Sequence, residues 1–214
     1  MTLLIGIVGG SGSGKTTIAQ AIQRRLGERA VMIAEDSFYG DWGADPAFDA
    51  ATFDFDDVAS RDHALMASQL AALKAGERVQ VPVYDFVTHR RLADQSTALG
   101  PAEVVIVEGL HLFCTPAVAS QFDLKVFVDT PADVRFIRRL IRDQAERGRS
   151  WDSVVAQYLS TVRPAHVRQV EPSRTQAEIV ILDEAAAVRL TDPTSVDRLI
   201  APILADPRMK CHLQ

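Results

Sequence analysis

Residues 9–16 read Gly-Gly-Ser-Gly-Ser-Gly-Lys-Thr and match the pattern Gly-x-x-x-x-Gly-Lys-Ser/Thr at every fixed position. The apolar run at 3–8 predicts a buried strand before this loop, and the apolar spacing at 17–22 predicts a helix after it. Glycines allow positive φ, so backbone N–H groups can surround a phosphate, and the helix N-terminus adds partial positive charge. The alternative is an unliganded glycine-rich turn, which the strand and helix context argues against. The stretch therefore predicts a phosphate loop that binds a nucleoside triphosphate.

Two side chains of this loop have expected chemical roles. Lys15 is expected to reach the β- and γ-phosphates, and the Thr16 hydroxyl is expected to hold Mg²⁺. The residues expected to bind the nucleotide are Gly9, Gly10, Ser11, Gly12, Ser13, Gly14, Lys15, Thr16 and Thr17.

The composition is ordinary for a soluble globular protein. The chain has 214 residues, of which 47% are hydrophobic and 24% charged, and its net charge of −5 argues against a nucleic-acid partner. This length predicts a single domain over 1–214. The two cysteines are not spaced for a disulfide framework or a metal site. Because no apolar run approaches the roughly 20 residues that span a bilayer and no signal peptide is recognisable, we expect no membrane partner and a cytoplasmic location.

Short apolar strands alternate with helical segments along most of the chain. Besides 3–8, the runs that predict strands are 30–34, 104–107, 124–128 and 178–182. Strands that alternate with helices form a mainly parallel sheet covered on both faces. We therefore predict an α/β fold with a mainly parallel five-stranded sheet flanked by helices.

The segment after the second strand has a different character. Residues 40–57 interleave aspartates with aromatic residues, which favours a loop or lid over a purely solvated acidic stretch. An amphipathic helix is predicted at 58–75, and a strand is predicted at 79–84, where Pro82 suits an edge position. These features predict a small β-hairpin or lid appendage to the main sheet.

Carboxylates stand at the ends of three predicted strands: Asp36, Glu108 and Asp129. Because the carboxyl ends of parallel strands meet at one edge, these acids are expected near the phosphate loop. Glu108 is placed to steady Mg²⁺, and Asp36 is placed to act as a base on an acceptor hydroxyl opposite the γ-phosphate. The alternatives are a strand-end salt bridge for Glu108 and a plain turn residue or helix cap for Asp36.

A helix is predicted to start at 130–133, with Thr130 as its N-cap. Its arginines recur at spacings i, i+3, i+4 and i+7 and so form one basic stripe: Arg135, Arg138, Arg139 and Arg142. The stripe runs into Arg-Gly-Arg at 147–149, where the helix is expected to break. This pattern favours a mobile clamp over phosphates, and a solvated helix face is the alternative.

Taken in order, several motifs resemble the uridine kinase (uridine–cytidine kinase) family of P-loop kinases. The resemblance covers roughly residues 3–182. Its most specific segments are Val-Tyr-Asp-Phe-Val-x-His at 83–89 and Glu-Arg-Gly-Arg at 146–149. The other matching segments are the phosphate loop, Asp36–Tyr39, Val107–Gly109, Phe127–Thr130, Arg142-Asp143, Gln157-Tyr158 and Val162–Pro164.

The resemblance implies a P-loop nucleoside-kinase fold, in which 40–100 is an acceptor-binding insertion with a helix and a β-hairpin and 131–165 is an arginine-rich lid region. It also implies a role for each matching residue. Asp36 is implied as the general base, with Lys15, Arg142 and Arg147 as further catalytic residues, and Thr16 and Glu108 as neighbours of Mg²⁺. The implied substrate-binding residues are Tyr39, Phe55, Asp56, Tyr84, Phe86, His89, Arg139, Arg147, Arg149 and Gln157.

Within that set, Asp56 and Arg139 match positions that hold the ribose 2′- and 3′-hydroxyls. Tyr84 and His89 match positions that recognise the base, and Tyr39, Phe55 and Phe86 match the walls of the pocket. Arg142, Arg147, Arg149 and Gln157 match residues near the phosphates and the substrate, and Arg149 is also expected to contact the nucleotide.

The resemblance thus predicts ATP-dependent phosphorylation of the 5′-hydroxyl of uridine or cytidine in pyrimidine salvage, by a homo-oligomer with a small-molecule nucleoside acceptor. The chain departs from the family pattern at 40–53, at Asp57-Val58 and at 183–185, which leaves the acceptor and the choice of ATP or GTP open. One alternative is a kinase of the same architecture that acts on a sugar phosphate or pantothenate. The other is a nucleotide-dependent switch without catalysis.

We predict that Lys15→Ala lowers turnover roughly 10²-fold or more, because the lysine charge stabilises the phosphates mainly in the transition state. The measurement is the steady-state rate of ADP release by purified, folded protein. Near-normal turnover would contradict the assignment of the phosphate loop.

Overall fold

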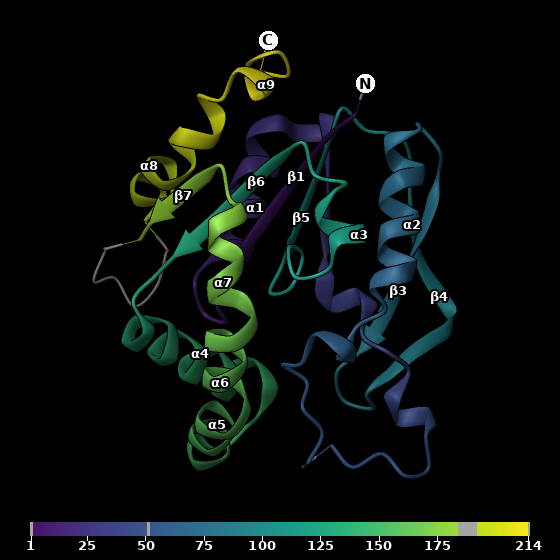
Figure 1. Ribbon diagram of the computed structural model, residues 1–214, viewed down its shortest axis with the longest axis vertical. Helices are drawn as coiled ribbons and strands as arrows, with labels where there is room; N and C mark the ends of the chain where they lie inside the picture. Colours follow the sequence, from purple (N-terminus) through teal and green to yellow (C-terminus); the bar gives the residue numbers. More distant parts are fainter. Residues whose placement is uncertain (1, 51, 184–191, 214) are drawn as a thin grey trace.

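The computed structural model describes residues 2–50, 52–183 and 192–213 (Figure 1). Its main sheet has five strands in the order β2-β5-β1-β6-β7, and all neighbours are parallel. The strands are β1 (Leu3–Gly9), β2 (Ala30–Ala34), β5 (Val104–Gly109), β6 (Leu124–Asp129) and β7 (Ile179–Leu182). The predicted α/β fold with a mainly parallel five-stranded sheet is confirmed.

Helices cover both faces of this sheet and form two hydrophobic clusters with it. On one face, α1 (Lys15–Leu26), α8 (Pro193–Leu204) and α9 (Pro207–Lys210) contribute buried side chains. On the other face, the cluster includes α2 (His63–Lys74) and α3 (Pro116–Ala119). Strands β1 and β5 are buried along their whole length, which explains their continuous apolar sequences.

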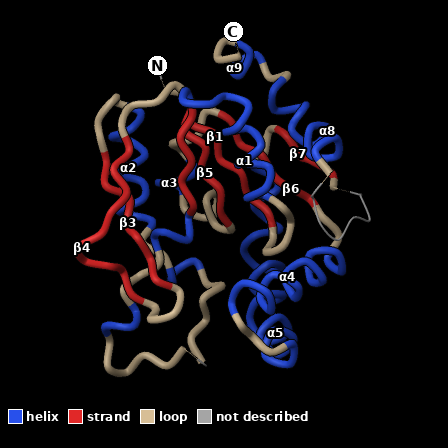
Figure 2. The backbone as a smooth tube through the Cα atoms, turned by 180° about the vertical axis from the view of Figure 1, so that it is seen from behind, coloured by secondary structure: helices blue, strands red, loops and turns tan. Residues whose placement is uncertain are grey.

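A separate antiparallel hairpin consists of β3 (Val79–Asp85) and β4 (Arg90–Leu99). Its register shifts between Pro82 and Tyr84, so the proline lies at an irregularity of a two-stranded sheet, where a missing N–H is tolerated. The hairpin lies beside α2 in both views of the molecule (Figures 1 and 2). The expected hairpin appendage is therefore present; the assignment of 40–100 to acceptor binding stays a prediction.

A long helical region faces the hairpin across the open end of the sheet (Figure 2). It starts with α4 (Ala132–Arg147), which ends at Gly148 in a left-handed conformation with φ 61°. The chain continues through α5 (Trp151–Gln157), α6 (Arg163–Ala165) and α7 (Glu171–Ser173). Two π-helical stretches, Tyr158–Val162 and His166–Val170, separate these short helices. Helices α4 and α5 therefore lie across the open end of the sheet from the hairpin.

Two sequence-based boundaries are wrong. The helix predicted at 58–75 begins only at His63, because the Asp62 carboxylate accepts a hydrogen bond from Leu65 N and caps it there. The helix after β6 has Pro131 rather than Thr130 at its N-cap, because the Thr130 hydroxyl donates to the Ser13 carbonyl instead. Near the C-terminus the chain forms α8, whereas the departure from the family pattern at 184–185 lies outside the described residues.

We expect Gly6→Ala in β1 to lower the free energy of unfolding by about 1–3 kcal/mol, because its Cβ would lie 2.8 Å from Phe113 and 2.9 Å from Phe122. Gly100→Ala is the matched control, since nothing lies within 4 Å of a Cβ there. Denaturant unfolding of both variants measures the difference. Equal stabilities for the two variants would show that the core relaxes around the added methyl group.

Candidate active site

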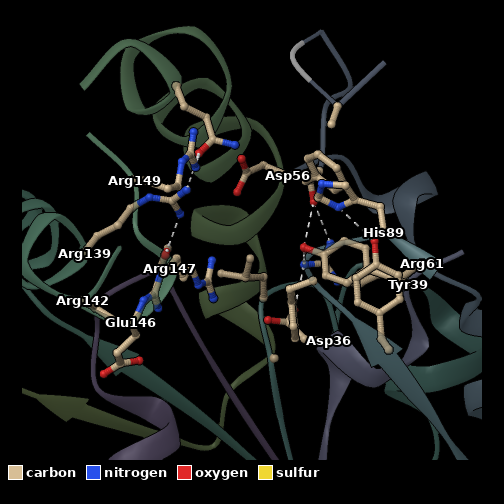
Figure 3. Close-up of a pocket in the computed structure, with 18 of the residues that line it drawn as sticks. Asp36, Tyr39, Asp56, Arg61, His89, Arg139, Arg142, Glu146, Arg147 and Arg149 are labelled. Atoms are coloured by element: carbon tan, nitrogen blue, oxygen red, sulfur yellow. Dashed lines mark hydrogen bonds and ion pairs between the residues drawn. The ribbon is translucent and has the colours of Figure 1, made fainter. Parts of the chain in front are cut away.

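A cavity of about 510 Å³ lies where the carboxyl ends of β1, β2 and β5 face the hairpin and α4. Figure 3 shows four arginines of the helical region on one side of this cavity, Arg139, Arg142, Arg147 and Arg149. Asp36, Tyr39, Arg61 and His89 lie on the other side. Of the residues expected from the sequence, those that line it are Ser11, Lys15, Asp36, Tyr39, Phe55, Asp56, Tyr84, Phe86, His89, Glu108, Arg139, Arg142, Arg147, Arg149 and Gln157. Ala50, Arg61, Val87, Gly109, Leu110 and Glu146 also line it and were not expected. One space therefore joins the phosphate loop to the expected acceptor residues.

The phosphate loop runs from the end of β1 into α1 with the geometry that its glycines require. Gly12 and Gly14 have φ values of 82° and 90°, which L-residues rarely adopt. A Cβ at Gly9 would lie 2.6 Å from Ser13 Oγ, and one at Gly10 would lie 3.0 Å from His166 Nδ1. The Ser13 hydroxyl is buried without a hydrogen-bond partner among the described residues. The loop thus forms a tight cradle, whose shape and polar groups fit a phosphate.

Behind the cradle, Ser11 and Lys15 line the cavity, whereas Gly9, Gly10, Gly12, Ser13, Gly14, Thr16 and Thr17 form the loop and the start of the helix. Burial lowers the pKa of Lys15, and the negative charges of Glu108 and Asp36 oppose this shift. Because burial disfavours the charged form of Lys15, a bound anion such as a triphosphate would stabilise its protonated ammonium group.

Thr16 and Glu108 meet at the base of the loop, where the Thr16 hydroxyl donates to Glu108 Oε1 at 3.1 Å. Burial raises the pKa of Glu108, and Lys15 opposes this shift. The described residues contain no group of three or more His, Cys, Asp or Glu side chains arranged to hold a metal ion. Mg²⁺ in phosphate-transfer sites is held by one or two protein oxygens together with water and phosphate, so the Thr16–Glu108 pair fits this ion.

Asp36 lies in the 3₁₀ turn Glu35–Phe38, directly after β2, and faces the cavity (Figure 3). Its side chain is 42% exposed, and Oδ1 lies 3.1 Å from Arg61 Nη2. The same turn places Tyr39 beside the cavity, with its hydroxyl donating to the Phe55 carbonyl at 3.1 Å. Asp36 is therefore a carboxylate that a ligand in the cavity can reach.

Aromatic side chains from three segments enclose the end of the cavity near the hairpin. The Tyr39 ring lies 5.0 Å from Tyr84 and 6.3 Å from Phe86, and the Phe55 ring stacks on His89 at 4.8 Å. His89 has a positive φ of 57°, and burial lowers its pKa, which favours the neutral form of the ring. Burial raises the pKa of Tyr84 to about 12, which keeps its hydroxyl protonated. This end suits a flat ring with polar edges.

Asp56 and Arg139 are buried residues that line the cavity and influence each other's pKa. Burial raises the pKa of Asp56, whereas Arg139 and a hydrogen bond from the Thr161 hydroxyl lower it. Arg139 donates to Ser11 Oγ and to Gln157 Oε1, at 2.8 Å in each case. A carboxylate and a guanidinium are thus available to one ligand, between the phosphate loop and the aromatic end.

The buried Asp143 carboxylate forms ion pairs with three of the arginines. The N···O distances are 2.8 Å to Arg142, 3.4 Å to Arg139 and 3.7 Å to Arg147. The Arg147 guanidinium also lies 5.4 Å from the centre of the Phe86 ring. Arg149, just beyond the helix, donates to Gln157 Oε1 and to Ser153 Oγ. A shared acid therefore holds these cations side by side at the edge of the cavity.

The four arginines of the expected stripe lie on one helix as their spacing predicts, but they do not act as one stripe toward the cavity, because their side chains have different partners. Arg135 donates to the Thr130 carbonyl at 3.0 Å, and Arg138 lies 2.6 Å from the Asp183 carboxylate. Neither residue lines the cavity. Asp129 likewise pairs with Arg174 at 3.1 Å and is not among the lining residues.

Sequence reasoning missed two buried charged residues that support this site, Glu35 and Arg61. Glu35 follows β2 directly, as Glu108 ends β5, so the rule that singled out strand-end acids could have found it. Arg61 stands between a 3₁₀ turn at Val58–Ser60 and α2, where no spacing or motif marks it.

A phosphate loop at the end of the central strand of a parallel sheet, a Thr–Glu pair suited to Mg²⁺ and an adjoining cavity with room for a second ligand define a P-loop kinase. A family profile described as "Phosphoribulokinase / Uridine kinase family" matches residues 4–187, and the chain belongs to this family.

Relatives that match nearly the whole chain agree with this. A protein named "Uridine kinase" from Chloroflexus aurantiacus is 42% identical over 204 residues, which are 95% of this chain and 95% of the relative. Another "Uridine kinase", from Clostridium perfringens, is 43% identical over 180 residues, or 84% of this chain and 86% of the relative.

Solved structures share the fold. A putative fructose transport system kinase from Silicibacter sp. TM1040 has a TM-score of 0.66 at 24% identity and covers 84% of this chain and 89% of its own. Phosphoribulokinase from Rhodobacter spheroides has a TM-score of 0.62 at 21% identity, covering 85% of this chain and 70% of its own.

Proposed function

We propose that this protein is an ATP-dependent kinase that phosphorylates the 5′-hydroxyl of uridine or cytidine. The observation that carries the proposal is that Lys15 of the phosphate loop, the Asp36 carboxylate and an aromatic pocket with His89 line one and the same cavity. The relatives named "Uridine kinase", at 42% and 43% identity, support this choice of acceptor.

In this proposal, the donor phosphates bind in the glycine cradle and on Lys15, which neutralises charge on the β- and γ-phosphates. Mg²⁺, when held by Thr16 and Glu108, would supply further positive charge to these oxygens. Asp36 accepts the proton of the 5′-hydroxyl as the hydroxyl oxygen attacks the γ-phosphorus; the bond between the γ-phosphorus and the bridging oxygen breaks, and ADP leaves. Arg142 and Arg147, which Asp143 holds in place, stabilise the charge on the transferred group.

The acceptor is oriented from both ends. Asp56 accepts hydrogen bonds from the ribose hydroxyls, and Arg139 donates to them, so the 5′-hydroxyl is directed toward Asp36. The pyrimidine ring lies against Tyr39, Phe55 and Phe86. Tyr84 and His89, whose hydroxyl oxygen and Nδ1 are 3.5 Å apart, meet the polar edge of the base.

We further propose ATP as the donor, a cytoplasmic location and a homo-oligomeric assembly. Among the residues that the structure places, no helix has the length and apolar character needed to cross a bilayer.

The proposed function is tested by a coupled ADP-release assay with a panel of acceptors. Uridine and cytidine should be turned over well above a sugar phosphate and pantothenate. If only the sugar phosphate or only pantothenate is turned over, the proposed acceptor is wrong. If the protein binds nucleotide but turns over no acceptor, it is a nucleotide-dependent switch and not a kinase.

Asp36→Asn tests the proposed base. The amide has nearly the same shape but cannot accept the hydroxyl proton, so kcat should fall about 10²–10⁴-fold while ATP affinity changes little. Steady-state kinetics with both substrates varied, together with an ATP titration, give the two quantities. A variant with full kcat and a raised KM for the nucleoside would make Asp36 a binding residue only.

The ribose contacts predict discrimination against 2′-deoxyuridine. Loss of the 2′-hydroxyl leaves Asp56 and Arg139 partly unpaired, so kcat/KM should fall on the order of 10²-fold relative to uridine. Asp56→Ala should shrink this ratio and leave ATP affinity unchanged. Equal kcat/KM for both nucleosides in the unmodified protein would show that this pair does not read the ribose.

A further inference from the structure

Arg61 is a buried cation that lines the cavity, and its side chain is 0% exposed. Its Nη2 atom donates to Asp36 Oδ1 at 3.1 Å and to the Tyr39 hydroxyl at 2.6 Å (Figure 3). Its Nη1 atom donates to the Phe55 carbonyl at 3.2 Å and to Ser60 Oγ at 3.0 Å. One guanidinium thus joins the turn after β2 to the loop that carries Phe55, one of the aromatic side chains around the cavity.

The surroundings of Arg61 keep it charged and fixed. Its Nε atom lies 3.7 Å from the buried Glu35 carboxylate, which balances its charge. His111 Nδ1 lies 3.2 Å from Nη1, and because a guanidinium can only donate, this nitrogen accepts and the imidazole is neutral. The guanidinium carbon also lies 4.2 Å from the centre of the Tyr39 ring. Contacts on every side therefore leave Arg61 one orientation.

Asp36, in contrast, has little else to hold its carboxylate. Its side chain is 42% exposed to the cavity, and Arg61 is the one hydrogen-bond partner that the described part of the chain gives it. The carboxylate torsion of an aspartate is broad and nearly two-fold, so an unrestrained Asp36 would sample many directions. A bond from a rigid donor to Oδ1 fixes the plane of the carboxylate.

We propose that Arg61 is the positioning residue of Asp36: by holding Oδ1, it keeps the other carboxylate oxygen directed at the acceptor hydroxyl. The inference rests on the proposed function only in taking Asp36 as the group that receives the hydroxyl proton. Arginine suits the role because it stays charged at all working pH values and cannot take that proton itself. Because Arg61 Nη2 also donates to the Tyr39 hydroxyl, the same side chain holds both the proposed base and an aromatic residue of the acceptor pocket.

A double-mutant cycle separates positioning of Asp36 from a general structural effect. Arg61→Met should lower kcat on the order of 10–100-fold when Asp36 is present, because a misplaced reacting group loses the near-attack geometry. In the Asp36→Asn background the same change should cost less than about threefold in kcat, since there is no base left to position. KM for ATP should stay the same in both backgrounds.

Arg91→Met is the matched control. Arg91 supports the same turn by donating to the Tyr39 and Phe38 carbonyls at 2.6 and 2.9 Å, but it does not contact Asp36. Its effect on kcat should be the same factor in both backgrounds. An equal loss from Arg61→Met in the two backgrounds would overturn the proposal and make Arg61 a structural residue like Arg91.

Arg61→Lys provides a second variant that keeps a positive charge beside Glu35. A single ammonium cannot bond Asp36, Tyr39 and the Phe55 carbonyl together, so kcat should again fall only when Asp36 is present. Thermal unfolding of each variant shows whether it is folded at the assay temperature, and loss of the fold in both variants would also overturn the proposal. Failure of the unmodified protein to phosphorylate any acceptor refutes the proposed function, whereas an additive cycle in an active kinase refutes only the role of Arg61.

Discussion

The buried carboxylate of Glu35 ties the ends of two neighbouring strands together. Its Oε2 atom accepts hydrogen bonds from Leu110 N at 2.6 Å and His111 N at 3.0 Å, so the turn after β5 is fixed to the end of β2. His63 at the start of α2 lies 2.9 Å from Oε1, and Arg61 approaches from the hairpin side. Burial alone would raise the pKa of Glu35, but Arg61 and His63 lower it well below its usual range. The charge is therefore kept, and the spacing between Asp36 and Glu108 depends on it.

The position of Gly109 follows from the same interaction. A Cβ there would lie 2.7 Å from Glu35 Cδ, so only glycine lets the carboxylate reach the backbone of the turn. The Glu-Gly pair at 108–109 thus serves two purposes. Under the proposed function Glu108 would hold Mg²⁺, while Gly109 leaves room for the acid that holds the two strands in place.

The fold could be predicted from the sequence because its evidence is local. Continuous apolar runs mark the five parallel strands, and the glycine loop marks the turn after β1. The lining of the cavity was also largely foreseen, since strand ends converge and motif segments carry the rest. Arg61, in contrast, is held partly by Tyr39, Asp36 and His111, which lie 22 to 50 residues away in the chain, and no local pattern encodes those contacts. The basic stripe misled because helix spacing does not give the partner of each side chain. Arg135 donates to a backbone carbonyl and Arg138 pairs with the distant Asp183, whereas Arg139 and Arg142 pair with an acid of their own helix.

The hairpin also bears on how such a site can diversify. Its base is anchored, since Val79 and Val81 are buried in the hydrophobic cluster with α2, while its far end carries Tyr84 and His89 to the cavity. The phosphate loop instead belongs to the central strand of a separate sheet. Under the proposed function, the residues at the far end of the hairpin that would read the base can therefore be exchanged without disturbing the core of the parallel sheet. Substrate preference at this end of the cavity could then change while the phosphate loop stays the same.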